Sequence, residues 1–436
     1  MFTTMKVTKK SYEDVINLPI PKYEKPVRGL KYFRKFAYKT FLNELNKNNF
    51  TYKIIGMEKL KKNEPAIYIM NHSCSVDLEI LVKLIGNRHF YIVGTHDAFI
   101  GKKTLMKYCG GIIPAKKLVP DLNLITDISH VLNNLKCSIF LLPEASWCLG
   151  GKETIIPESL GKMLKYFKVP VINIKTYGAY QRRPQYNNAH NTKETRNVNV
   201  HAEMEYLFSK EDLKKLSGDQ INNKLKEIFT YDHFRWQFEN KIKVEETFRA
   251  KGLHHALYKC PNCGSEGKTT SEGSKLKCTN CNKEYELTEY GKLKALNGKT
   301  EFEYITDWYD WENECVKKDL HNNKYDVTCE VEIYAVVDFK SFYDIGYGTL
   351  RQNKDKIILK LKDGTKIFEH HHKECYSLYA DFYFYGYKDA ISFGNSRIQF
   401  YCFTELEDYP VLKARFAAEE AYKMLKSKES KNVRKD

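Results

Sequence analysis

Long hydrophobic runs are absent from this sequence. No window approaches the roughly 20 apolar residues that a membrane-spanning helix needs. The N-terminus also lacks a basic head followed by an apolar stretch, so we expect no signal peptide. Any contact with a membrane is therefore expected to be peripheral.

The cysteines do not form the pattern of a disulfide framework. Four of the twelve stand in two close pairs, Cys260/Cys263 and Cys278/Cys281. The other eight are scattered: Cys74, Cys109, Cys137, Cys148, Cys315, Cys329, Cys375 and Cys402. A chain of 436 residues is also much longer than the small secreted scaffolds that depend on disulfides. We therefore expect a protein of the reducing cytosol.

The charge balance is basic, with 71 Lys and Arg against 55 Asp and Glu and a net charge of +16. Such an excess favours an anionic partner, such as nucleic acid, an acidic membrane surface or a phosphorylated substrate. The abundance of Lys, Asn, Ile and Tyr also fits the bias of an AT-rich genome, which adds lysines without a function. Hydrophobic residues make up 42%, enough for two or three domains with packed cores.

Four short apolar runs are typical of buried parallel strands: residues 66–70, 90–94, 138–143 and 169–174. Helical stretches separate them, and in residues 121–136 the apolar side chains recur on one helix face. This alternation predicts an α/β domain, which we place at residues 1–250.

Two further segments of this domain carry their own predictions. Residues 29–46 have the pattern of a basic amphipathic helix, which lies in a membrane interface or packs on its own domain. Residues 181–200 are polar and irregular, which predicts a loop or an excursion from the domain.

His72 and Asp77 follow directly on the first predicted strand. General-base catalysis needs a histidine held near an orienting carboxylate. On one continuous helix, side chains five positions apart would point about 140° apart, so the pair meets only if His72 lies in a loop and the helix starts near Ser75. Asp77 would then fix the tautomer of His72 and raise its basicity. Chance alone gives one or two such pairs among 13 histidines.

The surrounding motifs add a family resemblance. Asn71-His72 with Asp77 resembles the first signature of the bacterial 1-acyl-sn-glycerol-3-phosphate acyltransferase family. Three later segments resemble the other signatures of that family, in the expected order: residues 111–116 (GIIPAK), 142–147 (LPEASW) and 169–174 (VPVINI). The resemblance covers roughly residues 30–200.

This resemblance implies transfer of a fatty acyl group from acyl-CoA or acyl carrier protein to the hydroxyl group of a lysophosphatidic acid-like glycerolipid. It implies His72 as the general base and Asp77 as the residue that orients it. The implied substrate-binding residues are Asn71, Lys116, Lys117 and Glu144. The lysines would neutralise the acceptor phosphate, where the family usually has Arg, and Glu144 would shape the acceptor site.

The third signature departs from the family pattern at two residues. Ala145 and Trp147 stand where the family usually has Gly and Arg. Loss of that Arg removes a phosphate ligand that the family implies. The identity of the acceptor therefore stays open: it is a lysophosphatidic acid-like lipid, another lysolipid or a headgroup-bearing alcohol.

The four paired cysteines predict a zinc ribbon at residues 255–290. Each Cys-x-x-Cys supplies two thiolates from a tight turn, and Gly264 and Asn282 follow where a positive φ is often required. Four cysteine ligands leave no open coordination position on the metal, so we expect a structural zinc ion bound by Cys260, Cys263, Cys278 and Cys281. A dithiol redox pair would not need two matched turns.

Residues 325–430 alternate with a period of two and end in a helical stretch at 410–427. We expect an antiparallel β module with a terminal helix, which resembles a PH-like domain. His370-His371-His372 is read as a solvated strand edge in preference to a metal site.

Together these features predict a cytoplasmic acyltransferase at the inner face of the cell membrane, in contact with a lysophospholipid acceptor and an acyl donor. The alternatives are a nucleic-acid-binding zinc-ribbon protein and a non-catalytic lipid-binding scaffold. We expect no nucleic-acid partner, because residues 264–277 have few aromatic residues and three lysines.

Overall fold

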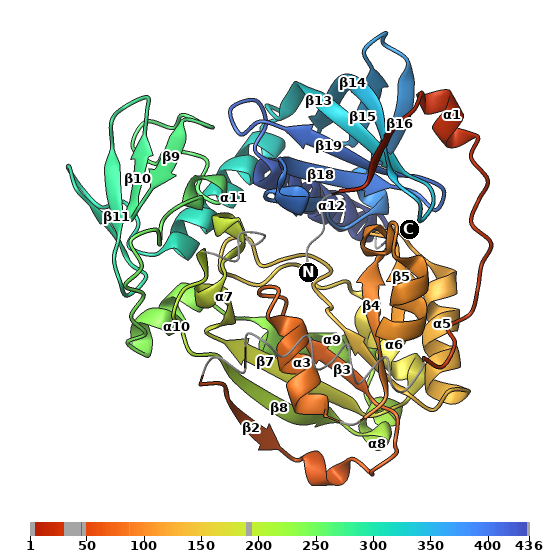
Figure 1. Ribbon diagram of the computed structural model, residues 1–436. Coiled ribbons are helices and arrows are strands. Elements are labelled where there is room, and N and C mark those ends of the chain that lie inside the picture. Colours follow the sequence, from red (N-terminus) through yellow and green to blue (C-terminus); the bar gives the residue numbers. More distant parts are fainter. Residues whose placement is uncertain (1–4, 30–44, 46–48, 87, 189–193, 434–436) are drawn as a thin grey trace.

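The computed structural model describes residues 5–29, 45, 49–86, 88–188 and 194–433. The predicted basic helix at residues 29–46 falls almost entirely outside the described residues. Figure 1 shows three β-sheets: a large one at the bottom, a small one at the left and a third at the top. No helix among the described residues has the length and hydropathy needed to cross a membrane.

The bottom sheet belongs to an α/β fold. Its strand order is β2 (Thr51–Ile55), β8 (His201–Phe208), β7 (Val171–Tyr177), β3 (Ile67–Met70), β6 (Ser138–Leu141), β4 (Phe90–Thr95) and β5 (Ile112–Ala115). Neighbouring strands are parallel except for β7 and β8. The four strands predicted from apolar runs are confirmed as β3, β4, β6 and β7.

Helices cover both faces of this sheet, which explains why its central strands β3 and β6 are buried and mostly apolar. Tyr68 and Met70 of β3 share a hydrophobic cluster with α3 (Asp77–Ile85). Ile67 and Ile69 point to the opposite face. There they pack with residues of α5 (Leu122–Asn133), α6 (Ser159–Phe167), α8 (Lys210–Lys215) and α9 (Gly218–Phe229). The helix predicted at residues 121–136 is thereby confirmed as α5.

The described part of residues 181–200 is mostly irregular, as its polarity predicts, but it is largely buried instead of exposed. It starts within α7 (Ala179–Arg182) and continues through a short 3-10 turn, Gln185–Asn187. Arg182 donates hydrogen bonds to the backbone carbonyls of Arg196 and Val198. Arg196 donates to the carbonyl of Arg249 at 2.6 Å. Polar side chains are buried here because main-chain acceptors satisfy them.

The small sheet at the left of Figure 1 contains the paired cysteines. Its order is β12 (Leu293–Ala295), β11 (Glu284–Leu287), β10 (Lys275–Cys278) and β9 (Thr269–Glu272). Two helices lie on either side of it in the chain, α10 (His233–Glu239) before it and α11 (Ile305–His321) after it. Tyr285 of the sheet packs against Trp308 of α11 with ring centroids 5.0 Å apart, so the ribbon shares its core with α11.

The top sheet is the predicted antiparallel module. Its order is β16 (Lys366–His371), β15 (Lys356–Leu361), β14 (Phe342–Asn353), β13 (Asp326–Val336), β19 (Gln399–Thr404), β18 (Asp389–Gly394) and β17 (Tyr379–Asp381). The predicted terminal helix is confirmed as α12 (Val411–Val433). The PH-like topology stays a prediction, and His372 is buried, contrary to the predicted solvated edge.

The N-terminal segment ties the top sheet to the bottom one. β1 (Val7–Lys9) pairs in parallel with β14, and the short helix α1 (Tyr12–Ile16) follows. The chain then descends along the right side of Figure 1, where Tyr23 donates a 2.6 Å hydrogen bond to Asp127 of α5.

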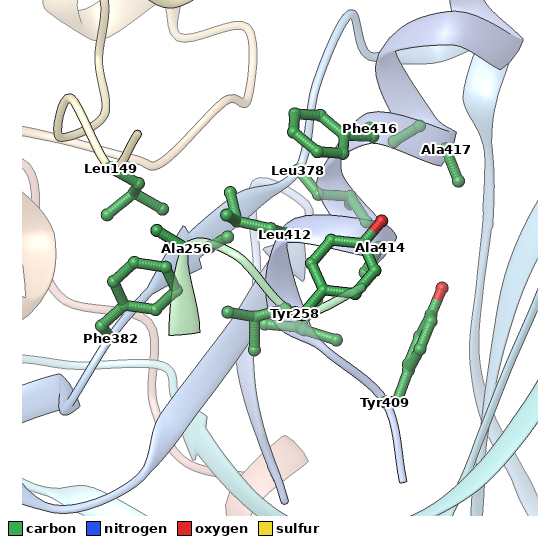
Figure 2. Packing of buried hydrophobic residues seen from close by; sticks show 14 of the residues in the cluster. Leu149, Ala256, Tyr258, Leu378, Phe382, Tyr409, Leu412, Ala414, Phe416 and Ala417 are labelled. Carbon is green, nitrogen blue, oxygen red and sulfur yellow. The ribbon is translucent and has the colours of Figure 1, made fainter. Parts of the chain in front are cut away.

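One hydrophobic cluster joins the ribbon, α11, the top sheet and α12, and it extends to Leu149 of the α/β part. Figure 2 shows Leu149 beside Leu412 of α12 and Ala256. The division at residues 1–250, 255–290 and 325–430 stays a prediction.

Candidate active site

His72 and Asp77 meet at the carboxyl end of β3. The strand ends at Met70, and Asp77 is the first residue of α3, so His72 lies in the intervening loop as expected. His72 Nδ1 is 3.0 Å from Asp77 Oδ2. The carboxyl ends of parallel strands are where α/β sheets hold ligands, so the pair stands at an appropriate edge.

Asp77 is almost fully enclosed, with 1% of its side chain exposed. Its Oδ2 also accepts hydrogen bonds from the backbone amides of Ser73, at 2.8 Å, and Cys74, at 3.1 Å. Burial raises the pKa of Asp77, and the hydrogen bonds from His72 and the two amides oppose that rise. The Asp77 carboxylate accepts a hydrogen bond from Nδ1–H, which leaves the lone pair of His72 Nε2 available to act as a base.

The loop after β6 holds the backbone of His72. The His72 amide donates to Glu144 Oε2 at 2.8 Å, and the Cys148 amide donates to the His72 carbonyl at 3.0 Å. The other carboxylate oxygen of Glu144 accepts from the Thr154 amide and the Tyr231 hydroxyl, both at 2.8 Å. Burial raises the pKa of Glu144 to about 7.

Trp147 of the same loop covers the ring of His72. The ring centroids are 3.8 Å apart and the planes are inclined by 25°. Ala145, two residues earlier, has a left-handed backbone with φ 51°, a conformation that suits glycine. Both departures from the family pattern therefore lie within the loop that contacts His72.

Asn71 supports His72 from the sheet. Its side chain is buried, accepts a 2.9 Å hydrogen bond from the Thr176 amide and donates to Ser73 Oγ at 3.0 Å. These contacts join β3 to β7 directly below the loop. The expected substrate-binding role of Asn71 stays untested, and its described contacts are all within the protein.

A buried histidine behind the site escaped the sequence analysis. His233 Nε2 lies 3.3 Å from Ser73 Oγ, and its ring stacks on Tyr180 with centroids 4.9 Å apart. Burial lowers the pKa of His233 to about 3, so the ring is neutral at physiological pH. No local motif marks His233 or Tyr231, because their partners are distant in the sequence.

Lys116 and Lys117 follow β5, which is three strands away from β3 in the sheet that carries His72. Lys117 Nζ is 3.1 Å from Asp97 Oδ2, with 2% of the lysine side chain exposed. It also sits 3.6 Å from the ring centroid of Tyr379 in the top sheet. Lys116 donates to the Ser396 carbonyl. No contact within the described part of the chain links either lysine to His72.

Both lysines border a cavity of about 200 Å³ between the α/β part and the top sheet. Arg397 and Tyr401 of the top sheet and Tyr23 of the N-terminal segment also line it. The expected site residues therefore fall into two groups: Asn71, His72, Asp77 and Glu144 form one cluster, and the two lysines lie at this cavity.

The four paired cysteines converge at one point. Their Sγ atoms all lie within 4.8 Å of one another, with Cys260 and Cys281 3.7 Å apart and Cys263 and Cys278 3.8 Å apart. Tetrahedral thiolates at the usual Zn–S distance of about 2.3 Å would be about 3.8 Å apart. The donor set therefore fits zinc.

Both cysteine turns have the geometry that a zinc site uses. Gly264 and Asn282 have φ 76° and 58°, as expected. The Asn262 amide group donates to Cys281 Sγ at 3.4 Å, and that of Asn280 to Cys263 Sγ at 3.6 Å. Such hydrogen bonds stabilise thiolate ligands.

Comparisons with known proteins include a distant likeness to a solved structure. The sequence matches no protein-family model and no curated protein sequence. Among solved structures, the 1-acyl-sn-glycerophosphate (LPA) acyltransferase PlsC from Thermotoga maritima aligns with a TM-score of 0.35 and 16% identity. The alignment covers 49% of this chain and 83% of that chain. A TM-score this low supports no inference about function.

Proposed function

We propose that this protein is an O-acyltransferase that moves a fatty acyl group from acyl-CoA or acyl carrier protein to the hydroxyl of a lysophosphatidic acid-like glycerolipid. The observation that carries the proposal is the 3.0 Å contact of His72 with the buried Asp77 at the carboxyl end of β3. The order of the four sequence motifs supports the same reaction.

The chemistry follows from the free nitrogen of His72. Nε2 removes the proton of the acceptor hydroxyl as its oxygen attacks the thioester carbonyl carbon. Asp77 stabilises the imidazolium through Nδ1. The tetrahedral intermediate collapses with loss of the thiolate, which takes the proton from His72. The products are an ester and a free thiol, and the enzyme forms no covalent intermediate.

Glu144 and Trp147 prepare His72 for this step. Glu144 binds the His72 amide, so the imidazole is held by its backbone as well as by Asp77. The indole of Trp147 lies over the imidazole and stabilises its cationic form through the ring face. Because both contacts already hold the imidazole in place, it needs little rearrangement when it takes the proton of the acceptor hydroxyl.

We propose that the acceptor phosphate binds in the cavity lined by Lys116. That lysine has no carboxylate partner among the described residues, whereas Lys117 is paired with the buried Asp97. We therefore propose Lys116 as a phosphate-binding residue and Lys117 as a residue of the interface with the top sheet. Asn71 is proposed to orient the loop of His72 rather than to bind substrate.

The remaining parts of the proposal concern zinc and the membrane. The four cysteines would hold a structural zinc ion that stabilises the ribbon. The acceptor is a membrane lipid, so the proposal includes peripheral binding to the inner face of the cell membrane. The basic net charge of +16 favours an anionic surface.

A thiol-release assay tests the reaction and identifies the acceptor. Acyl-CoA and acyl carrier protein are offered in turn with lysophosphatidic acid, other lysophospholipids and headgroup-bearing alcohols. We expect thiol release that depends on one of these acceptors. Lipid binding without thiol release for any acceptor would contradict the proposal and favour a non-catalytic scaffold.

A further inference from the structure

The loop at residues 144–151 has two sides with different partners. One side holds His72 through Glu144, Trp147 and Cys148. The other side faces α11 and α12, which are the helices that flank the top sheet in the chain. The position of His72 therefore depends on how firmly this second side is held.

Arg415 of α12 is the charged group on that second side. It is 2% exposed and donates from Nη1 to Ser146 Oγ at 3.4 Å. Its Nη2 donates to the Tyr309 hydroxyl of α11 at 3.5 Å. Its Nε donates to Glu419 Oε1 at 3.1 Å, one helical turn further along α12. The planar guanidinium thus joins the loop and both helices with three different nitrogens.

The backbone of the loop is pressed against the same helices. A Cβ atom on Gly150 would lie 2.2 Å from the ring of Tyr309, so only glycine fits. Leu149 belongs to the same hydrophobic cluster as Leu412 and Phe416 of α12, as Figure 2 shows. Burial of a charged group costs free energy unless it is paired and hydrogen-bonded, and Arg415 meets both conditions through Glu419.

We propose that Arg415 is a positioning residue for acyl transfer: it fixes Ser146, and through the loop it fixes the imidazole of His72. The C-terminal helix then completes the active site of the α/β part. This inference rests on the proposed function for its kinetic consequence, because a displacement of about 1 Å at a catalytic group lowers turnover by roughly 100-fold.

Two matched serine variants test the proposal. Ser146→Ala removes the hydroxyl that links Arg415 to the loop. Ser377→Ala removes an equally buried hydroxyl that donates to Glu419 Oε1 at 2.7 Å on the far side of the same network. We expect S146A to lower kcat by about 10- to 100-fold with KM unchanged, and S377A to leave kcat unchanged. Equal loss of kcat in both variants would overturn the proposal.

Arg415→Lys provides a second test that keeps the charge next to Glu419. A lysine cannot reach three partners with a planar fork. We expect R415K to lower kcat as S146A does, and the double variant S146A/R415K to lose little more than either single variant. Full additivity of the two losses would contradict a shared role.

Nuclear magnetic resonance of the histidine rings separates this proposal from the proposed function. We expect S146A to shift the His72 ring signals and S377A to leave them in place, whether or not the protein turns over. Absence of thiol release by the wild type would refute the proposed acyltransferase function, but the resonance experiment would still test whether Arg415 positions His72. Unmoved His72 signals in S146A would refute the positioning role.

Discussion

Trp147 lies over His72 with ring centroids 3.8 Å apart. The indole occupies a sequence position at which the resembled family usually has Arg, so an aromatic ring faces the base where a cation would otherwise stand. An arginine there would disfavour the imidazolium that forms during proton transfer, whereas the face of an indole favours it.

Substitution of Trp147 measures this effect. A cation–π contact in a partly desolvated site contributes about 1–2 kcal/mol, so we expect Trp147→Leu to lower kcat by roughly 5- to 30-fold. Trp147→Phe retains an aromatic face and should lose less. Steady-state kinetics with both substrates checks the result. Equal kcat in the wild type and the leucine variant would show that the stack does not assist the reaction.

The buried Glu144 predicts a specific pH dependence of stability. Its pKa is raised from 4.5 to about 7 by burial. Between these values the folded protein keeps a proton that the unfolded chain releases, so the free energy of unfolding falls as the pH rises, by about 3 kcal/mol from this group.

Glu144→Gln isolates this contribution, because other titrating groups are common to both proteins. The variant should lack this fall between pH 4.5 and pH 7. Near pH 4.5 the variant should also be less stable than the wild type. The side-chain NH2 group of the glutamine would face a backbone N–H, so two donors would meet without an acceptor. Denaturant unfolding at both ends of the window gives the difference. Parallel pH dependence of the two proteins would contradict a raised pKa for Glu144.

The zinc ribbon makes a metal-content prediction. The purified protein should contain one zinc ion per chain, and Cys263→Ser should reduce both the zinc content and the melting temperature. Cys315→Ser, at a half-exposed cysteine outside the cluster, is the matched control and should change neither. Elemental analysis and calorimetry provide the two readouts. A stable wild type without metal would refute the ribbon assignment.

The two neighbouring lysines should respond differently to substitution. Lys117→Met leaves Asp97 buried without its partner, and we expect it to destabilise the fold by about 3–5 kcal/mol. Adding Asp97→Asn should recover much of that loss. Lys116→Met should leave stability unchanged and raise KM for a phosphate-bearing acceptor. An unchanged KM for every such acceptor would remove Lys116 from the binding site.

Short-range patterns predicted much of this fold. The four strands are apolar runs that are buried on both faces, so each is recognisable without its neighbours. The loop position of His72 followed from helix geometry. Side chains five positions apart do not meet on one helix, so the histidine had to precede the helix for the pair to be in contact. The cysteine cluster followed from ligand spacing.

Long-range contacts explain what was not predicted. β1 pairs with residues 342–344, far along the chain, and no local signal marks it as a strand of the top sheet. Residues 181–200 are polar yet largely buried where they are described, because distant backbone carbonyls satisfy their guanidinium groups. Trp147 and Arg415 acquire their proposed roles only through contacts that the folded chain creates.

The most direct measurement is thiol release by the His72→Ala variant with the acceptor on which the wild type acts. His130→Ala, on α5 and remote from the catalytic pair, is the matched control. We predict that H72A abolishes turnover while its circular dichroism and melting temperature remain close to wild type, and that H130A retains activity. Turnover by a folded H72A protein would contradict His72 as the general base.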